Sequence, residues 1–254
     1  MNLLPSLSGE RHQLFVEQNN IPLSGGIIIL ITFFFIEKFN INLFLIFIFL
    51  IGFFSDLKIF KSPSVRFFLQ VLCIFLFVII YDFHILNIRI FLLDFLLKYK
   101  FFSYFFVIFC LLVITNGTNF IDGLNGLVLG YFILILIIIY NLQLYENLNI
   151  TQFEILYFMA CLFFLLVFNF FNKLYIGDSG SYLLGFSFGI LLIAIYDSNS
   201  TISPFFIVLL LWYPCFENLF SIIRKYRFNT SPLKSDNKHL HQMLFYFIKK
   251  KFNL

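Results

Sequence analysis

Residues 101–127 read FFSYFFVIFCLLVITNGTNFIDGLNGL and change character at Asn116. The stretch 101–116 is mostly apolar and approaches the roughly 20 residues that cross the hydrocarbon core of a bilayer. Asparagine, aspartate and glycine then recur up to Gly126, where a second apolar run begins. The pattern predicts a helical membrane protein that carries polar groups at the end of a span.

The whole chain has the same membrane character. Of its 254 residues, 61% are hydrophobic and 12% are charged, whereas soluble domains have roughly 25% charged residues. We therefore expect an all-α fold, a polytopic transmembrane bundle of about eight spans in a single domain, 1–254. The predicted spans are 23–37, 39–54, 67–81, 101–116, 126–143, 153–170, 181–197 and 203–223.

One apolar stretch, 82–100, is interrupted by five charged residues and is not counted among the spans. A charge at the centre of a span costs roughly 2.5 to 3.5 kcal/mol. An interfacial or re-entrant hairpin is therefore favoured over a ninth span. The charges are Asp82, Arg89, Asp94, Lys98 and Lys100.

Most of the basic residues fall on one side of the predicted bundle. That side receives the N-terminal segment (1–22), three loops and the His-containing tail (224–254), and the positive-inside rule makes it cytoplasmic. The loops are 55–66, 117–125 and 171–180. We expect a multi-pass protein of the inner (cytoplasmic) membrane without a signal peptide. The small net charge of +4 and the lack of a long basic run argue against a nucleic-acid partner.

Four polar residues follow each other at every third position near the end of the fourth predicted span: Asn116, Asn119, Asp122 and Asn125. On a straight helix such residues drift by about 60° per step, and the intervening glycines weaken a helix. Asn and Asp caps of a helix end explain one or two of them. Carboxylates near the membrane are costly, so we favour a ligand site.

A second polar segment, Gly177-Asp-Ser-Gly-Ser181, precedes the span 181–197. Ser179 or Ser181 is expected to cap the new helix, whose first N–H groups favour an anion. The Asp178 carboxylate beside such an anion suits Mg²⁺, which prefers oxygen ligands and bridges to phosphates.

Two further segments on the same side contain charged or imidazole side chains. In the tail, Lys238, His239 and His241 are interpreted as phosphate contacts, with a zinc site or an ordinary surface loop as alternatives. Asp56 and Lys58 open a loop that Arg66 closes, a pattern that a polar loop near lipid headgroups explains equally well.

Together, these segments resemble the polyprenyl-phosphate N-acetylhexosamine-1-phosphate transferases, relatives of phospho-N-acetylmuramoyl-pentapeptide transferase. The resemblance covers about residues 20 to 242 and places its motifs in the family's order. The matching pieces are Pro22 to Gly26, Gly52 to Lys58, Asn116 to Leu127, Phe168-Asn169 with Tyr175 to Gly185, and Asp236 to His241.

The resemblance implies that a UDP-N-acetylhexosamine and undecaprenyl phosphate give a lipid diphospho-sugar and UMP. This reaction would initiate the synthesis of a cell-envelope polysaccharide, such as that of lipopolysaccharide or of the cell wall. It implies Mg²⁺, with Mn²⁺ as an alternative, and a lipid bilayer; a homodimer is left open. By motif position, the catalytic residues would be Asp56, Asp122 and Asp178, of which Asp122 and Asp178 would bind the metal. The substrate-binding residues would be Asn119, Asn125, Asn169, Lys58, Arg66, Lys238, His239 and His241.

The chain departs from the family pattern at three points. Ser55 replaces the first of two adjacent carboxylates, and Asn125 replaces an aspartate. The chain also lacks a span before the glycine pair and one after the His loop, which implies a compact or truncated member. Ser55 and Asn125 motivate a second hypothesis, a catalytically impaired membrane binding or scaffold protein. A transporter is the third, although we find no internal repeat.

Overall fold

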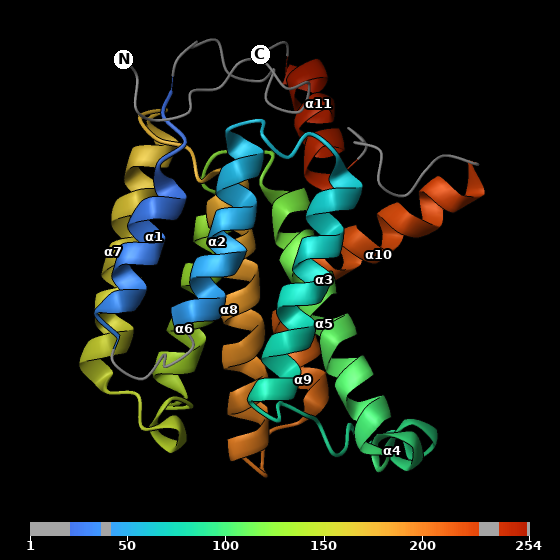
Figure 1. The fold of residues 1–254 in the computed structure, drawn as a ribbon. Coiled ribbons are helices and arrows are strands. Elements are labelled where there is room, and N and C mark those ends of the chain that lie inside the picture. Colours follow the sequence, from blue (N-terminus) through green and yellow to red (C-terminus); the bar gives the residue numbers. More distant parts are fainter. Residues whose placement is uncertain (1–20, 37–41, 229–238, 253–254) are drawn as a thin grey trace.

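A computed structural model describes residues 21–36, 42–228 and 239–252 of the chain. Predictions for the remaining residues, including Lys238, lie outside the described part. The described part confirms an all-α fold (Figure 1). Its α-helices are α1 (Gly25–Phe34), α2 (Asn42–Asp56), α3 (Pro63–Ile80), α4 (Phe91–Leu97), α5 (Lys100–Ile121), α6 (Leu127–Asn141), α7 (Gln152–Phe170), α8 (Gly177–Ser198), α9 (Pro204–Leu210), α10 (Trp212–Arg227) and α11 (Leu240–Phe252), with a short 3₁₀ turn at Glu146–Leu148.

The helices α1 to α8, apart from α4, run up and down in one bundle (Figure 1). Four of them, α3, α5, α7 and α8, are long and apolar enough to cross a membrane. α9 and α10 reach that length together but bend by 77° at their junction, and α1, α2 and α6 are shorter apolar helices. Each predicted span thus contains a helix, and the chain is a polytopic membrane protein.

The segment 82–100 contains no helix long enough to be a span. It consists of an irregular stretch followed by α4, which lies at the end of the bundle away from α11 (Figure 1). Arg89 donates hydrogen bonds to the carbonyl oxygens of Ser200 and Ile202, at 3.1 and 3.0 Å. These contacts join the segment to the loop between α8 and α9. The segment is thus a connection outside the spans.

The predicted loop 117–125 is partly wrong, because α5 continues to Ile121. Thr118 Oγ1 donates to the carbonyl oxygen of Ile114 at 2.8 Å, which satisfies this buried hydroxyl within α5. Gly117 is needed for a different reason. A Cβ atom there would lie 2.1 Å from the carbonyl oxygen of Pro214, so the glycine lets α5 and α10 approach closely.

α8 lies in the centre of the bundle and packs against α1, α2 and α5. Nearly all of its residues are buried, and its mean hydropathy of 1.7 is the lowest of the four long apolar helices. Because protein surrounds it, α8 tolerates glycine and serine along its length. Its first turn, at Gly177, lies where the end of α2 meets the end of α5.

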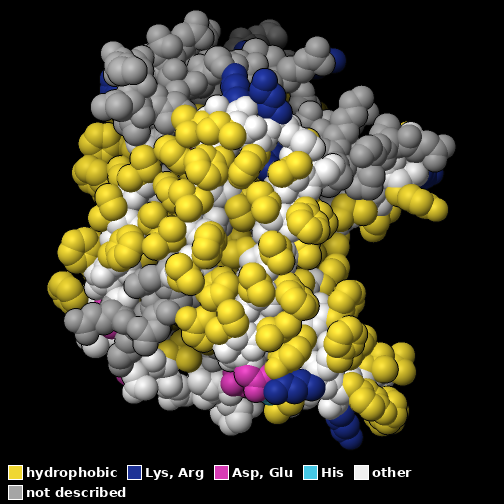
Figure 2. All heavy atoms as spheres, viewed as in Figure 1, with side chains coloured by type: hydrophobic (Ala, Val, Ile, Leu, Met, Phe, Trp, Pro, Cys, Tyr) yellow, Lys and Arg dark blue, Asp and Glu magenta, His cyan; other side chains and the backbone are white. Residues whose placement is uncertain are grey.

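The outer surface of the bundle is apolar. Figure 2 shows hydrophobic side chains over most of the visible face, with lysine and arginine near its two ends. On α3, the exposed side chains Phe68, Leu72, Phe75 and Ile79 recur every three or four residues, which places them on one face of the helix. This is the surface expected of helices that face lipid.

Candidate active site

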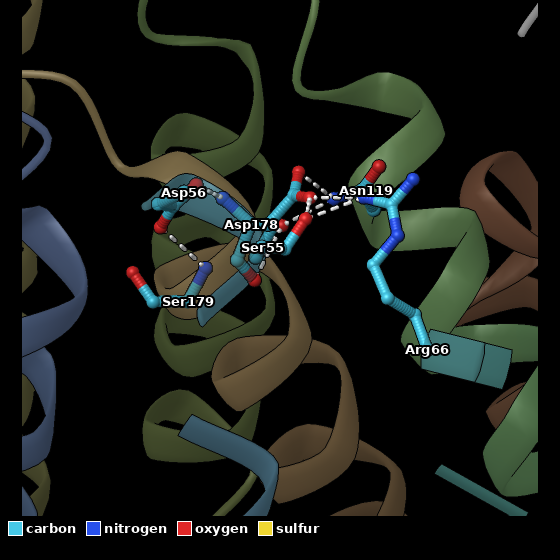
Figure 3. A network of polar contacts seen from close by, with 7 residues as sticks. Ser55, Asp56, Arg66, Asn119, Asp178 and Ser179 are labelled. Carbon is cyan, nitrogen blue, oxygen red and sulfur yellow. Dashed lines mark hydrogen bonds and ion pairs between the residues drawn. The ribbon is translucent and has the colours of Figure 1, made fainter. Parts of the chain in front are cut away.

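The Asp178 carboxylate is the centre of a polar network at the end of the bundle (Figure 3). Its Oδ2 accepts hydrogen bonds from Ser55 Oγ at 2.6 Å and from Arg66 Nη1 at 2.7 Å. Its Oδ1 accepts one from Asn119 Nδ2 at 2.7 Å. Arg66 Nη1 also donates to Ser55 Oγ at 2.5 Å. The structure therefore brings three predicted site residues together from α3, α5 and α8, with Ser55 from α2.

Asp56, the last residue of α2, caps α8. Its Oδ1 accepts a hydrogen bond from the Asp178 N–H at 2.8 Å and its Oδ2 accepts one from the Ser179 N–H at 3.1 Å. A carboxylate is favourable there because the helix N-terminus carries partial positive charge. The prediction that Ser179 or Ser181 caps α8 is wrong, because α8 already begins at Gly177. Asp56 also takes the N–H groups that we expected to bind a substrate anion.

Asp122 directly follows α5 and is half-buried. Burial, together with the nearby charges of Asp178 and Asp56, raises the pKa of its carboxyl to about 8. The three predicted catalytic carboxylates therefore gather at one end of the bundle, close enough to repel one another.

The donor set fits a magnesium ion held in part by its substrate. Within the described ranges, no group of three or more His, Cys, Asp or Glu side chains is arranged to hold a metal. Mg²⁺, however, is commonly bound by one or two carboxylates together with water and phosphate oxygens. Asp178 and Asp122 would supply such a pair, and the Arg66 guanidinium already lies on Asp178 as a positive group.

Two of the predicted substrate-binding residues make contacts within the protein. Asn169 is buried, accepts a hydrogen bond from the Gly126 N–H at 2.6 Å and donates one to the carbonyl oxygen of Leu174 at 2.9 Å. Asn125 donates a hydrogen bond to the side chain of Asn172. These contacts fix the turn after α5 against the end of α7. A role in substrate binding stays a prediction for both residues.

The two histidines lie beside the same turn, at the start of α11. Their rings are parallel, with centroids 5.8 Å apart. His239 Nδ1 lies 2.9 Å from Glu217 Oε2, and His241 Nδ1 lies 3.0 Å from the Tyr213 hydroxyl. Burial, together with the neighbouring His239, lowers the pKa of His241 to about 4. A Cβ atom on Gly123 would lie 2.5 Å from His241 Nε2, so this ring closely approaches the Asp122 turn.

Lys58, another basic residue predicted to bind substrate, is not buried as the two histidines are. It is exposed in the turn after α2 and has a backbone φ of 59°.

The sequence reasoning missed Glu217. Its carboxylate is 1% exposed on α10 and accepts hydrogen bonds from the Leu240 N–H at 2.8 Å as well as from His239. The signal was present, because Glu217 is the one charged residue of the apolar run 203–223. A carboxylate in such a run is costly unless it has a partner.

Comparison with known proteins identifies the family. The sequence model of the family described as "Glycosyl transferase family 4" matches residues 38–196, more than half of the chain. The chain belongs to glycosyl transferase family 4. The matched range includes the family 4 chain's residues Asp56, Asp122 and Asp178, and it ends before α10 and the histidines.

Two curated relatives are similar to part of this family 4 chain. One is the "Probable undecaprenyl-phosphate N-acetylglucosaminyl 1-phosphate transferase" of Bacillus subtilis (strain 168), 34% identical over 53% of the chain and 38% of the relative. The other is the "Decaprenyl-phosphate N-acetylglucosaminephosphotransferase" of Mycolicibacterium smegmatis, 31% identical over 52% of the chain and 37% of the relative. The matched regions thus span less than half the length of each curated relative.

Proposed function

We propose that the chain transfers a sugar 1-phosphate from a UDP-N-acetylhexosamine to undecaprenyl or another polyprenyl phosphate. In this reaction an oxygen of the lipid phosphate forms a bond to the β-phosphorus of the UDP-sugar. The bond between that phosphorus and the bridging oxygen breaks, and UMP leaves with the oxygen. The observation that carries the proposal is the cluster of Asp56, Asp122 and Asp178 at the end of a membrane bundle. The names of the two relatives support the substrates.

The chain's own residues would act by positioning the substrates. Asn119 holds one oxygen of Asp178, while Asp56 fixes the first turn of α8 beneath it. A phosphate monoester is already mostly ionised at pH 7, since its second pKa is about 6. The lipid phosphate therefore needs no strong base, and positioning with charge neutralisation supplies most of the catalysis.

We assign the metal to Asp178 and Asp122, with Mg²⁺ favoured and Mn²⁺ as the alternative. When bound, the ion would neutralise charge on the diphosphate and so make UMP a better leaving group. Basic groups at the same end of the bundle, such as Lys58 and Arg66, would offset the remaining phosphate charge.

The proposal is tested by UMP release from membranes that contain the protein. UMP should appear from a UDP-N-acetylhexosamine only when both undecaprenyl phosphate and Mg²⁺ are added. Asp178→Asn should reduce the rate by about a hundredfold or more, a loss typical of a group that stabilises the transition state. The matched control is Asp197→Asn, an exposed aspartate at the opposite end of α8. Turnover by Asp178→Asn at the wild-type rate would remove Asp178 from the reaction.

We also propose that this end of the bundle faces the cytoplasm and that the membrane is the bacterial inner membrane. Basic residues of the described part gather there and support this orientation by the positive-inside rule. They are Lys58, Lys61, Arg66, Lys173, Arg224, Lys225 and Arg227.

The orientation can be tested by cysteine labelling after the native cysteines have been replaced. Lys61→Cys should react with a membrane-impermeant maleimide in inverted vesicles and stay unlabelled in intact spheroplasts. Lys98→Cys, at the opposite end, should give the reverse pattern. The same pattern for both variants would contradict the proposed orientation.

A second candidate function is a membrane protein that binds these substrates without turning them over. Ser55 is the observation that favours it, because this hydroxyl donates to Asp178 at the position where the family has a carboxylate. If the wild type is inert and Ser55→Asp releases UMP, this second function gains support. Robust turnover by the wild type ends it.

A further inference from the structure

The Arg66 side chain bridges two elements at the centre of the site. It lies in the first turn of α3, and its Nη1 contacts both Ser55 Oγ on α2 and Asp178 Oδ2 on α8 (Figure 3). Both side chains of the Arg66–Asp178 ion pair are 24% exposed. The pair is therefore largely shielded from water. Partly buried ion pairs are screened by salt less than ion pairs at the surface.

Among the contacts of the described residues, Arg66 is the positive group that lies on Asp178. Asp56 is stabilised by the N-terminus of α8, through the N–H groups of Asp178 and Ser179. Asp178 instead receives neutral donors from Ser55 and Asn119, and its positive partner is Arg66. An unpaired carboxylate so close to Asp56 would be costly. The guanidinium therefore does for Asp178 what a bound cation would do.

We propose that Arg66 is the resident counter-ion of Asp178, and that it leaves Asp178 Oδ2 when a divalent cation binds there. This inference rests on the metal of the proposed function. Mg²⁺ binds oxygen at about 2.1 Å, whereas the guanidinium nitrogen lies 2.7 Å from Oδ2. Two hydrogen-bond donors already occupy this oxygen, and a guanidinium beside a divalent ion would be repelled.

Ser55 gives Arg66 its second anchor. The hydroxyl accepts from Arg66 Nη1 at 2.5 Å and donates to Asp178 Oδ2 at 2.6 Å, so it links the two charged groups. A carboxylate at position 55 would instead place a second anion beside the Arg66 guanidinium. With serine there, the guanidinium competes directly for Asp178. When it leaves, Arg66 becomes available to a substrate phosphate, which is the role that the sequence predicted.

The test is Mn²⁺ binding to the full-length protein in detergent, followed by electron paramagnetic resonance of the free ion. Arg66→Gln removes the competing charge and should tighten the Mn²⁺ dissociation constant by about tenfold, which corresponds to about 1.4 kcal/mol. Ser55→Ala removes the hydroxyl that contacts Arg66 and should tighten the Mn²⁺ dissociation constant by a smaller factor. Lys61→Gln, which removes an exposed positive charge from the α2–α3 loop, is the matched control and should change it little.

Thermal unfolding supplies a readout independent of metal counting. In EDTA, Arg66→Gln should unfold at a lower temperature than the wild type, because Asp178 has lost its counter-ion. Saturating Mn²⁺ should narrow that difference. If Arg66→Gln does not fold, the Ser55→Ala dissociation constant decides the question.

The possible outcomes separate this inference from the proposed function. Equal Mn²⁺ affinity in the wild type, Arg66→Gln and Ser55→Ala would overturn the counter-ion role and leave the metal site intact. Absence of Mn²⁺ binding in every variant would instead remove the metal from the proposed function, and the inference with it. If Lys61→Gln tightens the Mn²⁺ dissociation constant as much as Arg66→Gln does, the effect is due to the overall charge near the site, and the inference is overturned.

Discussion

A Cβ atom on Gly177 would lie 2.7 Å from Oδ2 of Asp56, so the carboxylate fills the space beside the glycine. Gly177 also has a backbone φ of +73°, a region that residues with side chains rarely adopt. The first position of α8 thus requires a glycine for two reasons: a Cβ atom has no space there, and the backbone φ is positive. The contact joins the end of α2 to the start of α8 and so sets the position of Asp178.

Gly177→Ala should therefore destabilise the protein. The positive φ alone costs about 1 to 3 kcal/mol for a residue with a side chain, and the Asp56 carboxylate must also move. We expect a lower unfolding temperature in detergent together with weaker UMP release. Gly130→Ala on α6 is the control, because a Cβ atom there meets nothing within 4 Å. Equal stability of the two variants would contradict the role of Gly177.

Glu217→Leu should detach α11 from α10. Glu217 accepts hydrogen bonds from both His239 and the Leu240 N–H, and a buried donor left without its acceptor costs about 1 to 3 kcal/mol. Amide hydrogen exchange over 240–252 should become faster, while the core of α8 stays protected. The exposed Glu146, replaced by Gln, is the control. Unchanged exchange in α11 would mean that the pair does not hold this helix.

The protein should lose stability as the pH falls from about 6.5 towards 4, in part through His241. Because burial lowers the folded pKa of His241 to about 4, the unfolded chain binds the additional proton in this range, and stability rises with pH. The contribution is at most about 3.4 kcal/mol, because the pKa falls from 6.5 to about 4 on folding. Unfolding temperatures at pH 5 and 7.5 should differ less in His241→Asn than in the wild type. A difference that is the same in both proteins would rule out His241.

Asn169→Ala should lower the stability of the protein more than it lowers its affinity for substrate. The change leaves the Gly126 N–H and the Leu174 carbonyl oxygen without their partner, at a cost of about 1 to 3 kcal/mol for each group left unsatisfied. We expect a lower unfolding temperature, with the KM for UDP-sugar nearly unchanged in the fraction that stays folded. Asn141→Ala, on the exposed end of α6, is the control. A raised KM at normal stability would favour the substrate role that the sequence predicted.

Much of the fold follows from local patterns, and much of the site does not. Hydropathy predicts the spans because apolar runs near bilayer length have few alternatives, and alternation of spans brings Asp56, Asp122 and Asp178 to one end. The capping of α8 is different, because Asp56 and Ser179 are 123 residues apart and neither flanking sequence encodes the contact. The sequence suggested the nearby serines as caps, since local spacing offers no sign of a carboxylate from another helix. The charge of Glu217 in an apolar run indicates that it needs a partner, but local spacing does not indicate that this partner is His239, 22 residues away.

The burial of α8 has a consequence for biogenesis. Its neighbours α1, α2 and α5 all precede it in the chain, so they have been synthesised when α8 emerges from the ribosome. α8 is also the least hydropathic of the long apolar helices, and it has less to gain from lipid than they do. We therefore expect the insertion of α8 to draw on helices already in the membrane, so that the Asp178 carboxylate enters the fold with one of the last spans.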